Sequence, residues 1–173
     1  RGFTNPHKQH FAPLNLDRLQ FWIDQGRIDA SKPITARELY ESRCVHRVRD
    51  GVKLLADGKE HLRTPVNLVV SRASHAAIAA VEQAGGSIVC RYYNATSLRA
   101  LVMPHKWLAK NEPLPHFADP VSQSDLLWYS SPNNRGYLAL RDRVAATTPS
   151  SPTSSNSSSC LLYTSPSPRD KRQ

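Results

Sequence analysis

Cysteine and histidine are the side chains with the most reactive chemistry in this sequence, and one pair has a suggestive spacing. Cys44 and His46 are two residues apart, so on a strand both would face one side and could form a Cys/His or metal site. We favour a packed cysteine beside a solvent-facing histidine, because no second ligand pair lies nearby. The sequence contains no nucleophile elbow, P-loop, zincin or dinucleotide motif. We therefore predict that the chain is not an enzyme and uses no cofactor or metal.

Side chains suited to phosphate binding and base stacking gather in residues 1–14. Cations and imidazoles alternate there with two rings: Arg1, Phe3, His7, Lys8, His10 and Phe11. An extended backbone of this kind can follow phosphates while a ring stacks on a base. Gly2, Pro6 and Pro13 break any helical or strand period, so we expect an extended arm. A solvated terminus without a partner is the alternative.

Two further groups of arginines could contact a polyanion. Arg43, Arg47 and Arg49 crowd the start of a predicted strand, where pairing with neighbouring acids is the competing interpretation. Arg72 lies beside the first turn of an alanine-rich segment, where helical N–H groups and a cation could share a phosphate. An ordinary surface arginine is the alternative for Arg72.

Composition narrows the class of partner. The chain has 173 residues, 39% of them hydrophobic, and 23 Lys+Arg against 14 Asp+Glu give a formal net charge of +9. This length fits one domain with tails, and no apolar run reaches the roughly 20 residues that cross a bilayer. The positive charge points to rRNA, DNA or anionic lipid, among which charge alone does not choose. The three cysteines are too widely spaced for a disulfide framework or a CxxC zinc site.

Apolar spacing and capping residues predict two short helices that follow the arm. The first covers residues 16–25, with Asn15 as its N-cap and Gly26 as its left-handed stop. In the second, TARELYES, Thr35 and Glu38 have the spacing of a capping box.

The middle of the chain predicts strands. Residues 51–62 indicate a strand, a turn at Asp57-Gly58 and a returning strand. The next segment has the order of a β-α-β unit, in which we expect Val69 and Val81 to face each other. Its expected elements are a strand over 65–70, a helix over 73–84 capped by Ser71, a Gly-Gly stop and a strand over 87–93.

The pattern weakens toward the C-terminal end. Pro104 interrupts a short helix, and we expect the aromatic segment 125–143 to lie across a surface of the domain or of a partner. The Ser/Pro/Thr tract from Thr147 predicts disorder, because it cannot bury a core. Residues 160–173 begin with CLLYTSPSPRD, which resembles a translated sequencing adapter. A phosphorylatable tail is the alternative.

Several short blocks follow one another along about the first hundred residues. They are Arg1-Gly2-Phe3, LNLDRL (14–19), PIT (33–35) with Leu39, DGVKLLADG (50–58), VSRAS (70–74) and VEQAGG (81–86). In this order they resemble the bacterial-type large-subunit ribosomal protein fifteen family, in its mitochondrial form. The junction 71–74 departs from the family pattern, because it lacks a histidine and a phenylalanine often found there.

The resemblance implies an α/β fold, an irregular β-β-α superhelix, behind a Gly/Arg-rich arm threaded into rRNA. By this resemblance we expect Arg1-Gly2-Phe3 to be the last residues of an arm that is mostly missing here. The stretch 104–140 exceeds the bacterial length, which favours the mitochondrial matrix over a bacterial cytoplasm. The implied organisation is an arm end over 1–14, a globular domain over 15–103, a mitochondrial-type extension over 104–146 and a tail over 147–173.

The implied function is a structural constituent of the large ribosomal subunit that binds and stabilises rRNA during assembly and translation. Its partners would be rRNA and neighbouring large-subunit proteins, with no membrane span and no small-molecule substrate. A free-standing RNA-binding or ribosome-assembly factor is one alternative, and a small enzyme using Cys44 and His46 is another. The expected RNA contacts are Arg1, Gly2, Phe3, His7, Lys8, His10, Arg43, Arg47, Arg49, Lys53 and Arg72.

Overall fold

A computed structural model describes residues 1–5 and 8–141 of the chain. His7 lies outside the described residues, as does everything from residue 142 onward. The predictions for the Ser/Pro/Thr tract and for residues 160–173 therefore concern a part of the chain that the structure does not describe.

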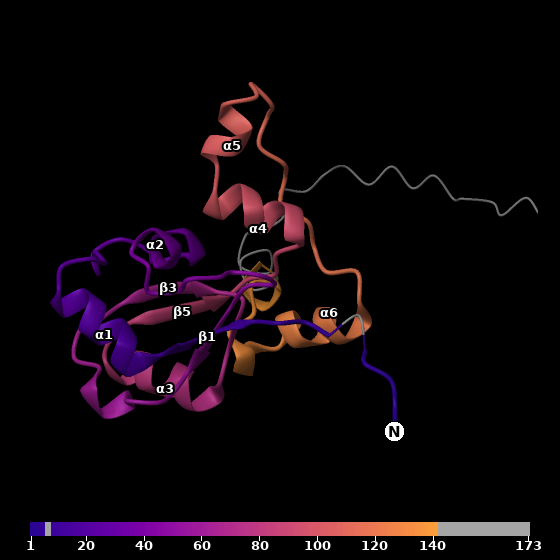
Figure 1. Cartoon of the computed structure of the whole chain (residues 1–173). Coiled ribbons are helices and arrows are strands. Elements are labelled where there is room, and N and C mark those ends of the chain that lie inside the picture. Colours follow the sequence, from indigo (N-terminus) through magenta and orange to yellow (C-terminus); the bar gives the residue numbers. More distant parts are fainter. Residues whose placement is uncertain (6–7, 142–173) are drawn as a thin grey trace, which may run out of the picture.

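Two small parallel sheets form the centre of the molecule (Figure 1). The first contains β1 (Ala12–Asn15), β2 (Val52–Leu55) and β4 (Arg72–Ala73), with β2 in the middle. The second pairs β3 (Asn67–Val70) with β5 (Ser87–Cys90), and every pairing is parallel. Helix α3 lies on one side of these strands, and α2 and α4 lie on the other. The α/β class predicted from the sequence is confirmed.

The predicted β-α-β unit is present as β3, α3 (His75–Gln83) and β5. Val81 is fully buried in it, but the strand side chains that are almost completely buried are Leu68 and Val70, whereas Val69 is half-buried. The predicted cap was wrong: Ser74, not Ser71, precedes α3 and accepts a hydrogen bond from the Ala77 N–H. The helix starts later than predicted because Arg72–Ala73 pair with β2 as a strand.

The returning strand predicted after Asp57-Gly58 does not form. Gly58 takes a left-handed backbone (φ 73°), and a 3₁₀ turn, η1 (Lys59–His61), follows it. Strand β2 already has β1 on one edge and β4 on the other. A hairpin partner would have no edge left to pair with, so long-range parallel pairing replaces the local antiparallel pair.

Both early helices form where the apolar spacing places them, as α1 (Leu16–Asp24) and α2 (Ala36–Glu41). The capping box at the start of α2 is present, because Thr35 and Glu38 satisfy each other's N–H groups. Asn15 occupies the N-cap position of α1, but its side chain donates to Asp57 instead of capping the helix.

The body begins earlier than residue 15. Leu14 is fully buried and pairs with Leu54 across β1 and β2, so residues 12–14 belong to the sheet rather than to the arm. The apolar side chain of Leu14 gains more from the core than from an extended path in solvent. Residues 1–5 project away from the body (Figure 1).

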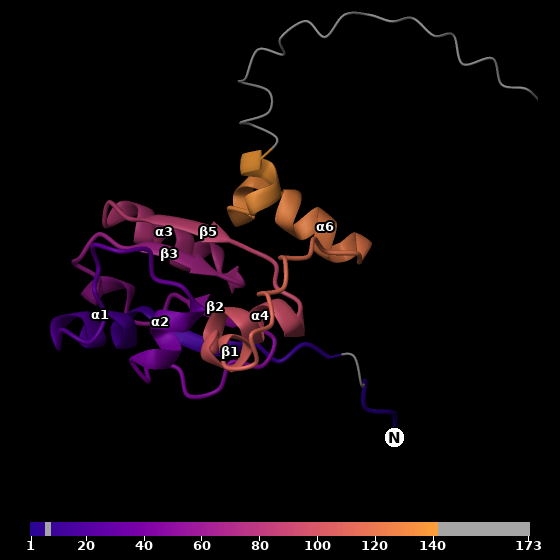
Figure 2. The ribbon, with the colours of Figure 1, turned by 90° about the horizontal axis from the view of Figure 1, so that it is seen from above.

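The C-terminal part contains α4 (Ala95–Val102), α5 (His105–Leu108), α6 (Gln123–Ser130) and η2 (Pro132–Asn134). It packs on the domain, since Tyr129 and Leu138 join the same core cluster as the sheets. Helix α6 lies beside the β3–α3–β5 unit when the molecule is seen from above (Figure 2). Within the C-terminal part, Gly136 allows the chain to pass close to α6, because an added Cβ would lie 1.9 Å from the Tyr129 carbonyl oxygen.

Candidate nucleic-acid interface

The N-terminal part of the arm presents exposed side chains. Arg1, Gly2, Phe3 and Lys8 are all exposed, and 92% of the Phe3 side chain is accessible to solvent. Within the described residues, neither Arg1 nor Lys8 takes part in an ion pair. Such cations keep their full charge available for an external anion.

Backbone hydrogen bonds fix the base of the arm against the segment before β2. The His10 N–H donates to Asp50 Oδ2 at 2.6 Å, and the Ala12 N–H donates to the Gly51 carbonyl at 2.8 Å. Gly51 has a φ of +129°, and a Cβ there would lie 1.9 Å from Ser71 Oγ. Only glycine fits this crossing, which holds the arm at one defined exit from the body.

Arg43, Arg47 and Arg49 are all exposed, and buried Cys44 and Val45 anchor the segment that carries them. Within residues 1–5 and 8–141, the considered pairing with neighbouring acids is not found, and Glu41 pairs instead with Arg37 on α2 at 2.8 Å. In the described part of the chain, none of these three arginines forms an ion pair. They form, with the arm, a set of unpaired cations.

Lys53 is exposed on β2, the central strand of its sheet. Its register partners on the two flanking strands are Pro13 and Arg72. The lysine therefore stands on the sheet face between the base of the arm and Arg72.

The preferred interpretation of Cys44 and His46, a packed cysteine beside a solvent-facing histidine, is confirmed, and the alternative with both on one face is not. Cys44 is 1% exposed, whereas His46 is exposed, and the segment forms bends rather than a strand. Burial raises the pKa of the Cys44 thiol, and the nearby Arg18 guanidinium offsets part of that rise. A thiol that resists ionisation is a poor nucleophile. Among the described residues, no group of three or more His, Cys, Asp or Glu side chains could hold a metal ion.

Arg72 is partly buried, and its guanidinium group contacts other parts of the molecule. Its Nη2 lies 2.7 Å from Asp125 Oδ1 and 3.4 Å from Gln9 Oε1. Its guanidinium carbon lies 5.1 Å from the ring centroids of both Phe11 and Trp128. The arginine thus joins the arm, β4 and α6 in one cluster, through charge and through cation–π contact.

This cluster changes the role considered for Arg72. The guanidinium is directed at Asp125 on α6, and Ser74 caps the first turn of α3. The phosphate contact predicted at that turn would require Arg72 to leave its intramolecular partners. The sequence does not reveal this pairing, because Asp125 lies 53 residues away.

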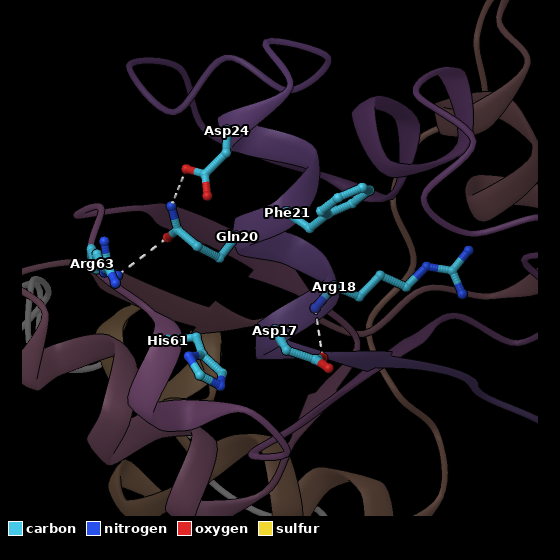
Figure 3. A pocket seen from close by; sticks show the side chains of 7 residues that line it. All are labelled: Asp17, Arg18, Gln20, Phe21, Asp24, His61 and Arg63. Carbon is cyan, nitrogen blue, oxygen red and sulfur yellow. Dashed lines mark hydrogen bonds between the residues drawn. The ribbon is translucent and has the colours of Figure 1, made fainter.

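The hollow along α1 is lined by side chains of both signs (Figure 3). Its volume is about 490 Å³. Gln20, which is buried at its wall, donates a hydrogen bond to Asp24 and accepts one from the backbone N–H of Arg63 (Figure 3). Asp17 and Asp24 accompany the cations here, and carboxylates repel phosphate. The hollow is therefore poorly suited to a nucleic-acid backbone.

A second hollow, of about 440 Å³, has cations as its only charged lining residues. Arg49 lines it together with Arg99 of α4 and Lys106 of α5. Sequence reasoning missed Arg99 and Lys106 because 50 residues or more separate them from Arg49. Folding brings the three cations together around an apolar floor that includes Leu98, Val102 and Met103.

A basic α/β body with an exposed arm and unpaired cations is suited to binding a polyanion. Residues 13–89 match a family of ribosomal proteins whose description names 50S-L15 and 50S-L18e among its members. The chain is 40% identical to "Large ribosomal subunit protein uL15m" of Neurospora crassa over 161 residues, which covers 80% of this chain and 51% of that protein. Over these matched residues the chain resembles the L15 family of ribosomal proteins.

Other relatives separate into two sets by how much of this chain they match. The uL15m of Danio rerio is 42% identical and covers 83% of the chain. The uL15 of Paramagnetospirillum magneticum is 51% identical but covers only 51% of the chain. The chain spans about half the length of the curated relatives it matches, 51%, 50% and 54% of these three. None of the helices within residues 1–5 and 8–141 has the length and apolar character needed to cross a bilayer.

Proposed function

We propose that this protein is a structural constituent of the large ribosomal subunit of mitochondria, where it binds and stabilises large-subunit rRNA. The observation that carries the proposal is the set of exposed cations on the arm and on residues 43–49, which form no ion pair with any other described residue. They occur in a chain whose relatives are named large ribosomal subunit proteins. Phosphates of a folded rRNA are the anions that such scattered cations neutralise.

The match to uL15m relatives supports the mitochondrial assignment. These matches cover 80% and 83% of the chain, whereas the uL15 match covers 51%. The chain therefore shares with the uL15m proteins a segment outside the uL15 match. A bacterial ribosome is the alternative location, and this difference in coverage argues against it.

The proposed rRNA contacts divide by position. Arg1, Gly2 and Phe3 would insert as an extended chain, with Phe3 available to stack on a base. The remaining proposed contacts are phosphate ligands: His7, Lys8, His10, Arg43, Arg47, Arg49 and Lys53. We assign Arg72 a different part, because its guanidinium already pairs with Asp125: it holds the base of the arm so that the other cations are correctly placed.

Neighbouring large-subunit proteins are the second class of partner in this proposal. Helix α6 and the segment before it expose Val121 (93%), Leu127 (67%) and Leu126 (39%) to solvent. Exposed apolar side chains that gather on one element are typical of protein contacts. The proposal gives the chain no catalytic part, which agrees with the buried Cys44 thiol.

Binding to rRNA at several salt concentrations tests the proposal. The full chain is titrated with large-subunit rRNA at about 50 and 200 mM salt, and affinity is expected to fall steeply, since each neutralised phosphate releases counterions. Sucrose-gradient sedimentation then locates the protein in mitochondrial extracts. Co-migration with the large subunit after a high-salt wash supports a structural constituent, whereas release into the free fraction indicates a separate assembly factor. Equal affinity at both salt concentrations contradicts the proposal.

A further inference from the structure

Two hollows on the α4–α5 side of the molecule adjoin, because Arg99 and Lys106 line both. The first is the 440 Å³ hollow that also includes Arg49. The second has a volume of about 520 Å³ and adds Trp107 and Lys110. Helices α4 and α5 project from the body on the side opposite α3 (Figure 1). We call these two hollows together the α4–α5 groove.

The groove has a strong excess of positive charge. Arg49, Arg99, Lys106 and Lys110 line it, with Glu112 as the one carboxylate among its lining residues. None of the four cations forms an ion pair within the described part of the chain. Cations without partners around a concave surface raise the local concentration of anions.

The groove also offers a surface for a flat, apolar group. Trp107 is half-buried and lines the second hollow, while Leu98, Val102 and Met103 form the floor of the first. Lysines and arginines beside an indole ring match the chemistry of an unpaired nucleotide, whose phosphate is anionic and whose base is a π surface. A base within a duplex is already stacked between its neighbours and cannot reach such a ring.

We propose that the α4–α5 groove binds a single-stranded segment of RNA, with phosphates at Arg49, Arg99 and Lys106 and a base stacked on Trp107. This inference rests on the proposed rRNA-binding function and adds a separate site to it. Apart from Val48 and Arg49, the lining of the groove lies outside residues 13–89, the part of the chain that matches the family model. The site would therefore be a property of the segment that follows the shared domain.

The test compares two double variants that remove equal charge. Arg99→Gln with Lys106→Gln alters the groove, and Lys59→Gln with Arg63→Gln alters exposed cations near η1 instead. Each full-length protein is titrated with a fluorescein-labelled uridine 12-mer and with a 12-base-pair RNA duplex. We expect the groove variant to lose about tenfold in affinity for the single strand and the control variant about twofold or less. Equal losses in both variants overturn the proposal, because they indicate unspecific charge.

Tryptophan fluorescence gives a second readout that charge alone would not move. Binding of the 12-mer is expected to quench the emission of the wild-type protein. Trp107→Leu should abolish most of that quenching, because the emission of Trp22 and Trp128 should not change when the 12-mer binds. Circular dichroism verifies that each variant is folded. Quenching that persists in Trp107→Leu overturns the stacking. A poly-glutamate peptide that displaces the 12-mer at lower concentration than unlabelled RNA overturns the choice of RNA and indicates an acidic protein partner.

Large-subunit rRNA, titrated in parallel, separates the two proposals. If the wild-type protein binds that rRNA while the groove variant is unaffected toward the 12-mer, the groove site fails and the proposed function stands. If the wild-type protein binds neither rRNA nor the 12-mer, the proposed function fails as well.

Discussion

Arg72 and Arg47 are the same residue type in opposite surroundings. The Arg72 side chain is 27% exposed, pairs with Asp125 at 2.7 Å and lies over two aromatic rings. Arg47 is exposed, and in the described part of the chain it forms no ion pair. The difference shows that the positions of acidic and aromatic neighbours decide whether an arginine holds the fold together or remains available to an anion.

The two regions also differ in what they connect. Arg72 contacts Gln9 and Asp125, which lie 63 and 53 residues away in the sequence. It therefore joins the arm to the C-terminal part across the body. Arg43, Arg47 and Arg49 extend from one continuous segment that Cys44 and Val45 anchor. Loss of Arg72 should loosen the structure, whereas loss of Arg47 should alter only the surface charge.

Val81→Asp should cause the largest loss of stability among the variants compared. Val81 is fully buried, so the variant would bury a carboxylate without a partner. We expect a loss of several kcal/mol, enough to unfold a domain whose total stability is about 5–15 kcal/mol. Circular dichroism measures the loss of folded structure. The control is Ala79→Asp on the exposed side of the same helix, which should change stability by about 0.5 kcal/mol or less. A folded Val81→Asp protein would contradict the placement of the core.

Arg72→Ala tests the structural half of the comparison. The substitution leaves Asp125, whose side chain is 13% exposed, without its cation. We expect the free energy of unfolding to fall by about 2–3 kcal/mol, less than for a fully buried pair because solvent still reaches this one. Urea denaturation measures the loss for Arg72→Ala, Asp125→Ala and the double variant. If the double variant loses the sum of the two single losses, the pair is not coupled.

Tyr129→Phe probes the same junction more gently. The Tyr129 hydroxyl donates to the Ser71 carbonyl at 2.8 Å, and its loss should cost about 1 kcal/mol. Burial, partly offset by Arg72, raises the pKa of Tyr129 from 10.0 to about 12. The folded state therefore favours the neutral phenol, and its contribution to stability is complete below pH 10 and lost as the pH rises toward 12. Denaturation midpoints across this range should fall more steeply for the wild type than for Tyr129→Phe, and equal slopes would contradict the assignment.

Short stretches of sequence predict most helices and strands of the body. The elements that they predict wrongly are decided by contacts between residues far apart in the chain. The capping box at Thr35 and Glu38 and the β-α-β order are visible in short windows of sequence. The returning strand after Gly58 is not excluded by any local signal, because β1 and β4 occupy both edges of β2 only after folding. Pairing across the chain decides that case.

The candidate site divides in the same way. Lys8, Arg43, Arg47 and Arg49 are exposed in the structure, as contacts to a polyanion require. The intramolecular partners of Arg72 could not be predicted, since residues 125–143 have aromatic side chains but no period that would place them against β4. The α4–α5 groove likewise depends on the approach of Arg49 to α4. The RNA contacts themselves stay predictions.

Arg47→Ala and Lys8→Ala test the other half of the comparison, and their expected effect on stability is the smallest. Both side chains are exposed and, among the described residues, lie outside every ion pair. Their removal should change the free energy of unfolding by about 0.5 kcal/mol or less.

Affinity for rRNA should nevertheless fall in both variants. Each lost phosphate contact should weaken binding about threefold to tenfold and lower the slope of log affinity against log salt by about one. The matched control is Lys32→Ala, because Lys32 pairs with Asp29 at 3.1 Å and lies outside the proposed contacts. An unchanged salt slope in Arg47→Ala would show that Arg47 does not contact RNA. A lowered unfolding midpoint in Lys8→Ala would show that arm residues before His10 also stabilise the body. If Lys32→Ala weakened binding as strongly as the other two, net charge rather than position would govern the affinity, and the distinction drawn between Arg72 and Arg47 would not extend to RNA.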